Sequence, residues 1–167
     1  DSWRSSSVTS YPKLAEVTKV QVELPDSADQ GFSITYAGGD NLSLFNDQGR
    51  QVPMDTARVQ DLMLAIRAGS FEGFERSLTT TARDSVLGST PWYILTITSS
   101  KGVQRIPFWR KNPRPGERDL DFKPLIADRD RMYALLNDTA LVVVQRFWWD
   151  RVTRPLVSLE PHWRAQP

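Results

Sequence analysis

Alternation of apolar and polar residues dominates this chain and constrains its fold more than any other feature. In the segment 17–24, Val20 and Val22 fall on one side, and charged and amide residues fall on the other. The same period of two recurs at 32–36 and in the β-branched, aromatic run 92–98. Alternation of this kind predicts strands that bury one face.

Turn-forming residues separate these segments at short intervals, which favours antiparallel pairing of neighbouring strands. Residues 99–102 and 137–138 have the composition of hairpin turns. Residues 110–121 contain two prolines and a glycine, which break both strand and helix periods, and predict a long polar loop. Further strands are expected at 42–45, 103–109, 131–136 and 141–144.

The period changes once, near the middle of the chain. Apolar residues spaced i, i+3, i+4 and i+7 form a single stripe, which predicts a helix over about residues 55–68. Asp55 is placed to cap its first turn, and Gly69 follows its end. Shorter helical turns are expected at 82–87 and 147–154. The stripe consists of Val59, Leu62, Met63 and Ile66.

These patterns predict an α+β fold, in which an antiparallel, meander-like sheet packs against one principal helix. A chain of 167 residues is long enough to bury about 70% of its unfolded surface in one domain. We expect a flexible polar tether at 1–16, a single domain at 17–157 and a C-terminal tail at 158–167. The predicted core contains Val20, Val22, Ile34, Leu62, Met63, Ile66, Ile94, Ile106, Leu135 and Val143.

The residue types available for catalysis are few. The chain has no cysteine and one histidine, His162, five residues from its end, which closes most routes to thiol, imidazole or Cys/His-metal chemistry. We therefore expect no cofactor, no metal and no enzymatic activity. A carboxylate-based hydrolase is the alternative, and it would need Asp119 and Asp121, or Asp128 and Asp130, to meet in a cleft. Arg129 and Arg131 alternate with the second pair, which favours ion pairs instead.

Aromatic and basic side chains supply the candidate binding residues. A net charge of +1 argues against nucleic acid as a partner, so a solvated loop is the favoured interpretation of the basic cluster after residue 108. Two adjacent tryptophans lie near the C-terminus; they must face different ways, so one is expected in the core. Exposed tryptophans could contact a protein partner or stack on sugar rings. The candidates are Trp148, Trp149, Trp109, Arg110 and Arg114.

The order of segments from residue 17 to residue 154 resembles an uncharacterised bacterial domain found in exported proteins associated with gliding-motility-type ABC transporter systems. The features that carry the resemblance are the Met54-Asp55 helix start, the helical stripe, and the paired segments 131–133 and 142–147. The resemblance implies an extracytoplasmic accessory role. It implies no catalytic residues.

The chain begins at Asp1 with a serine-rich stretch and has no apolar run long enough to span a membrane. This start favours a domain of an exported bacterial precursor, with a signal segment upstream, with or without a lipid anchor. We therefore expect a non-catalytic accessory or protein-interaction domain of an envelope complex, located in the periplasm or cell envelope. A carbohydrate-binding module that uses exposed tryptophans is the alternative.

Overall fold

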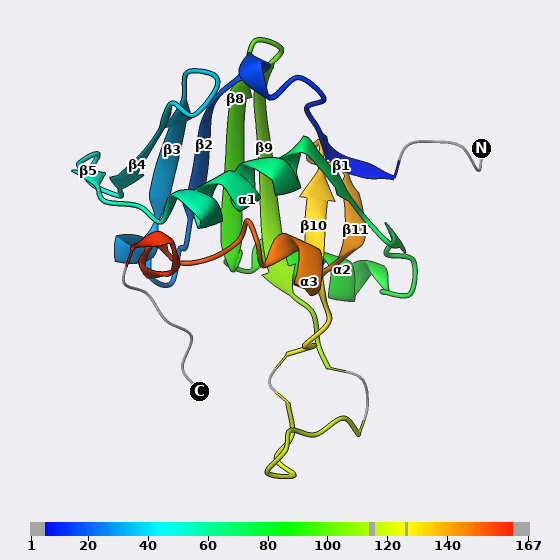
Figure 1. Cartoon of the computed structure of the whole chain (residues 1–167). Helices are drawn as coiled ribbons and strands as arrows, with labels where there is room; N and C mark the ends of the chain where they lie inside the picture. Colours follow the sequence, from blue (N-terminus) through cyan, green and yellow to red (C-terminus); the bar gives the residue numbers. More distant parts are fainter. Residues whose placement is uncertain (1–5, 114–115, 126, 162–167) are drawn as a thin grey trace.

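A computed structural model describes residues 6–113, 116–125 and 127–161 (Figure 1). Its main element is a nine-stranded antiparallel sheet, built from two meanders that join where β2 pairs with β8. In spatial order the strands are β5 (Gln51–Val52), β4 (Leu42–Asn46), β3 (Phe32–Tyr36), β2 (Val17–Glu23), β8 (Tyr93–Ser99), β9 (Gly102–Arg110), β10 (Arg131–Leu136), β11 (Ala140–Gln145) and β7 (Gly73–Phe74).

The register places the apolar residues of neighbouring strands opposite one another. Val20 pairs with Ile34 on one side and with Ile97 on the other, and all three are fully buried. The turn between β10 and β11 has Asn137 and Asp138 at positive φ. These residue types tolerate the left-handed conformation that a tight hairpin requires.

One face of the sheet is covered by α1 (Thr56–Arg67), which crosses the strands (Figure 1). Asp55 caps this helix, because its carboxylate accepts a hydrogen bond from the Arg58 N–H. Two shorter helices, α3 (Arg146–Trp149) and the 3-10 helix η3 (Leu156–Leu159), add buried side chains to the same core. The predicted helix at 55–68 is confirmed.

The opposite face is covered only in part, by α2 (Thr80–Gly88). A second, smaller core lies beneath it and contains Trp109, Tyr133 and Leu141. Leu135 and Val143 pack half-buried against this cluster. The prediction that they belong to the buried core is wrong, because odd-numbered positions of β10 and β11 face the sheet's partly covered side.

Over β2, β3 and β8 the same face carries polar side chains, including Lys19, Gln21, Thr35 and Thr96, as expected of a solvated antiparallel sheet. The other eight predicted core residues are buried. A large antiparallel sheet packed by a helix in a single domain confirms the predicted α+β fold. In the part of the chain that the structure describes, no helix is long and apolar enough to cross a membrane.

The tether predicted at 1–16 is wrong from residue 7 onward. β1 (Ser7–Ser10) pairs antiparallel with β6 (Ala68–Ser70), and η1 (Leu14–Glu16) follows before β2. Val8 and Tyr11 are buried in the main core, so this segment gains the apolar burial that orders it. Residues 1–5 lie outside the described part.

The predicted start of the C-terminal tail at residue 158 is also wrong. Leu159 is fully buried, and its carbonyl accepts a hydrogen bond from the Asp55 N–H at the start of α1. The domain therefore continues through η3. Residues 162–167, including His162, lie outside the described part. The remaining short helix, η2 (Ala28–Gln30), lies in the connection between β2 and β3.

Candidate functional site

The two adjacent tryptophans both belong to α3, and they do not form an exposed aromatic surface. Trp149 is 0% exposed, its ring lies 5.4 Å from that of Phe108, and its Nε1 donates to the Ser70 carbonyl. The prediction that Trp149 binds a ligand is wrong, because its ring fills the core. The expectation that one of the pair lies in the core is confirmed.

Trp148 is half-buried and is committed to neighbouring elements. Its Nε1 donates to the Ala65 carbonyl on α1 over 3.2 Å, and the Arg151 guanidinium lies 4.6 Å from its ring centroid. Arg151 is itself held by the Asp61 carboxylate. The exposed aromatic residue of α3 is Phe147.

Trp109 and Arg110, two further candidates, line one cavity of about 390 Å³ between α2 and the end of β9. Trp109 forms part of the floor, and its Nε1 donates to the Ser89 carbonyl. Arg110 is exposed, and its guanidinium lies 4.5 Å from the centroid of Trp92. Arg114 lies outside the described residues.

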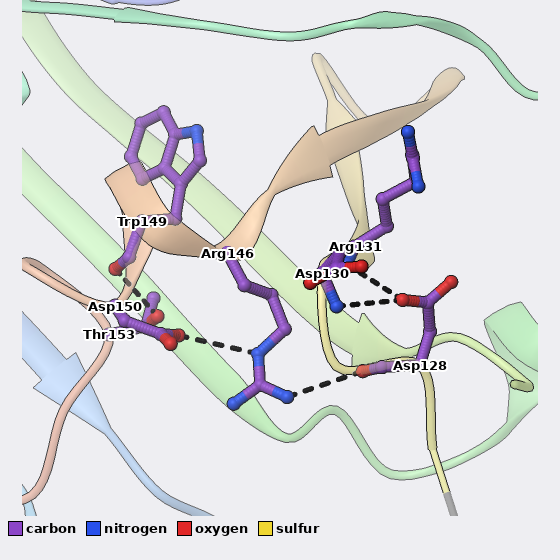
Figure 2. Close-up of polar contacts among 7 residues, drawn as sticks. All are labelled: Asp128, Asp130, Arg131, Arg146, Trp149, Asp150 and Thr153. Carbon is purple, nitrogen blue, oxygen red and sulfur yellow. Dashed lines mark hydrogen bonds and ion pairs between the residues drawn. The ribbon is translucent and has the colours of Figure 1, made fainter. Parts of the chain in front are cut away.

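A second guanidinium, that of Arg146, lies 4.8 Å from the centroid of the Trp92 ring. Arg146 also approaches the Asp150 carboxylate at 3.5 Å and donates to the Asp128 carbonyl, as Figure 2 shows. Burial raises the pKa of Asp150, and Arg146 opposes that rise. Arg146 therefore has an ion-pair partner in Asp150, whereas Arg110 forms no ion pair with a described residue.

Tyr133 forms the other aromatic wall of this cavity. Burial, with a smaller contribution from Glu75, raises the pKa of Tyr133 to about 12. Its hydroxyl is therefore protonated at neutral pH, which makes it a hydrogen-bonding group and not a general base.

In each predicted carboxylate pair, the first aspartate accepts hydrogen bonds from backbone N–H groups of the loop. Asp128 is buried, and its Oδ1 accepts from the N–H groups of Asp130 at 2.7 Å and Arg131 at 3.1 Å (Figure 2). The prediction that Arg131 forms an ion pair with its acidic neighbours in the sequence is wrong. Its guanidinium pairs instead with the Glu72 carboxylate at 2.7 Å. Among the described residues, no three His, Cys, Asp or Glu side chains form a group that could hold a metal ion.

Replacement of Asp128 with alanine should lower the free energy of unfolding by about 1–3 kcal/mol, because two backbone donors lose a buried acceptor. Urea denaturation followed by circular dichroism measures this loss. Asp130→Ala is the matched control, since the Asp130 side chain is exposed. Equal losses for the two variants would contradict the assigned role of Asp128.

A feature missed in the predicted polar loop is a hydrogen-bonded turn, residues 116–125, which we call the projecting turn. Figure 1 shows the connection between β9 and β10 extending away from the sheet. At its end Leu120 is 93% exposed and Phe122 is 82% exposed. The two apolar residues within the otherwise charged run 117–123 were the available signal in the sequence.

The backbone of the projecting turn is held in an unusual conformation. Phe122 has a φ of 61°, in the left-handed region that aromatic residues rarely adopt. Its N–H donates to the Asp119 carbonyl, and the Asp119 carboxylate accepts from the Asp121 and Lys123 N–H groups. The Asp119 carboxylate, one of the predicted catalytic candidates, therefore closes this turn.

The geometry thus supplies two separate candidate surfaces, the cavity beside Arg110 and the projecting turn. The resemblance to the domain of gliding-motility-type transporter systems stays a prediction. In comparisons with family models, curated proteins and solved structures, no match to this chain is found.

Proposed function

We propose that this chain is a non-catalytic interaction domain that binds a protein partner through the projecting turn. The observation that carries the proposal is the exposure of Leu120 and Phe122 at the end of a segment that extends from the sheet. Single exposed apolar residues are ordinary on protein surfaces. Two such side chains, two residues apart on one turn, are more typical of a contact site.

The strained backbone of Phe122 supports the same proposal. A non-glycine residue in the left-handed region costs about 1–3 kcal/mol, and such residues cluster at functional sites. The Arg118 guanidinium donates to the Phe122 carbonyl, and Asp119 fixes the turn from the other side. A turn that is already ordered loses less conformational entropy when it binds.

The charges around the two apolar side chains indicate the partner's chemistry. Arg118 and Lys123 are accompanied by Asp119 and Asp121, so the projecting turn carries both signs of charge. These four charges sum to zero, so an anionic membrane surface would gain no net attraction to them. An apolar cleft with a polar rim on a protein accommodates both the side chains and the mixed charges.

The proposed setting is the cell envelope of a bacterium, where the domain would act as an accessory component of a larger complex. The resemblance to a domain of exported proteins supports this setting. Fractionation of cells that express the full-length protein tests it: recovery with the cytosol would contradict it.

Replacing Leu120 and Phe122 with serine should abolish partner binding and leave the melting temperature nearly unchanged, because neither side chain is packed. The measurement uses a photo-crosslinking amino acid at position 120 in cells of the source organism, followed by mass spectrometry. We expect one discrete protein adduct, which Phe122→Ser eliminates.

Val103 provides the matched control, since it is 68% exposed on β9, away from the projecting turn. A crosslinker at position 103 should not yield the same adduct. Phe122→Gly removes the side chain and the strain together, so it should lose the adduct without losing stability. Identical adducts from both positions would contradict the proposal, as would adducts to lipid alone.

A further inference from the structure

We propose that the cavity between α2 and β9 binds a small sugar that carries one carboxylate, such as a uronic acid. This site is separate from the projecting turn, and it does not depend on the protein partner. The cavity, at about 390 Å³, falls within the roughly 300–1,000 Å³ typical of small-molecule sites. Its walls combine aromatic rings with hydroxyl, amide and charged groups.

Arg110 supplies the positive group that a carboxylate would need. Among the described residues, no carboxylate lies within 4.0 Å of its guanidinium, whereas Arg146 on the same indole has Asp150. Contact with the Trp92 ring, whose centroid is 4.5 Å away, places the guanidinium at the cavity wall. A planar guanidinium is well suited to bind a carboxylate through two parallel hydrogen bonds.

Uncommitted polar side chains around Arg110 match the hydroxyl groups of a sugar. Ser85, Thr90, Asn112 and Asp26 line the cavity, and in the described part of the chain their side chains make no hydrogen bond to protein. Asp26 accepts hydrogen bonds, Asn112 both donates and accepts, and the hydroxyls do either. Together they can satisfy several hydroxyls of one ring.

The floor of the cavity favours the apolar face of a sugar ring. The half-buried Trp92 contributes aromatic surface, Trp109 and Tyr133 add a small area because each is 5% exposed, and Val86 and Leu78 of the α2 region add aliphatic surface. Aromatic rings commonly pack against the C–H face of sugars and leave the hydroxyls free for polar contacts. The charges of Arg110 and Asp26 sum to zero, so the lining repels a monoanion less than a phosphate dianion, and a carboxylate is the favoured charge.

Titration of intrinsic fluorescence tests the proposal, because Trp92 and Trp109 both line the cavity. The probes are glucuronate, glucose and inorganic phosphate. We expect a saturable change with glucuronate, and an affinity at least tenfold weaker for glucose, which lacks the carboxylate. Arg110→Gln should reduce glucuronate affinity at least tenfold and equalise the two sugars.

Arg105→Gln is the matched control, since Arg105 is exposed on the same strand but does not line the cavity. It should leave glucuronate binding unchanged. Ser85→Phe adds bulk to the cavity wall from α2 and should abolish binding while the circular dichroism spectrum stays the same. Three outcomes would overturn the proposal: no saturable change, equal affinity for glucose and glucuronate, or tighter binding of phosphate. Because none of the three variants lies in the projecting turn, failure of the sugar titration leaves the crosslinking test unaffected.

Discussion

Replacement of Trp149 with alanine is expected to lower the free energy of unfolding by about 3–5 kcal/mol, the range for loss of a large buried aromatic ring. The ring is fully buried, contacts Phe108, and donates its indole N–H to the Ser70 carbonyl. The substitution therefore creates a cavity and removes a buried donor. Urea denaturation followed by far-ultraviolet circular dichroism measures the loss without relying on tryptophan fluorescence.

Phe147→Ala is the matched control, because Phe147 belongs to the same short helix but is 72% exposed. It should change stability by no more than about 0.5 kcal/mol. Trp149→Phe replaces the indole with a smaller aromatic ring that lacks the N–H donor, so its loss of stability should lie between the other two. Equal losses for Trp149→Ala and Phe147→Ala would contradict the burial of Trp149.

Long segments with a clear period were predictable because burial alone determines their pattern. The strand at 17–24 and the helix with Val59 and Ile66 each show several matches to one period, so both appear where the sequence places them. The first strand was missed for a physical reason. Val8 and Tyr11 are isolated apolar residues among serine and threonine, and the order of this segment depends on pairing with β6, far along the chain.

The candidate sites were less predictable because they depend on contacts between distant segments. Arg110 and Arg146 meet on Trp92 only through the register of the sheet and the start of α3. The sequence predicted that one of the two adjacent tryptophans lies in the core. It could not indicate which of the two this is. The left-handed conformation of Phe122 has no signal in residue type, since aromatic residues avoid it.

Close packing in the region where β1, β6 and α3 meet places a strict requirement on residue 69. A Cβ added at Gly69 would lie 2.5 Å from two ring atoms of Trp149 and 2.7 Å from the Thr9 hydroxyl oxygen. The Gly69 N–H also donates to that oxygen. The side chain of residue 69 must therefore be absent for strand pairing and indole burial to occur together.

Gly69→Ala is accordingly expected to lower the free energy of unfolding by about 1–3 kcal/mol or more, the range for overpacking a buried site. Urea denaturation gives the value, with Gly73→Ala as control, since a Cβ there meets nothing within 4 Å. In a Trp149→Phe background the loss should be smaller, because the smaller ring has fewer atoms beside residue 69. A Gly69→Ala loss that is identical in both backgrounds would show that contact with Trp149 is not its cause.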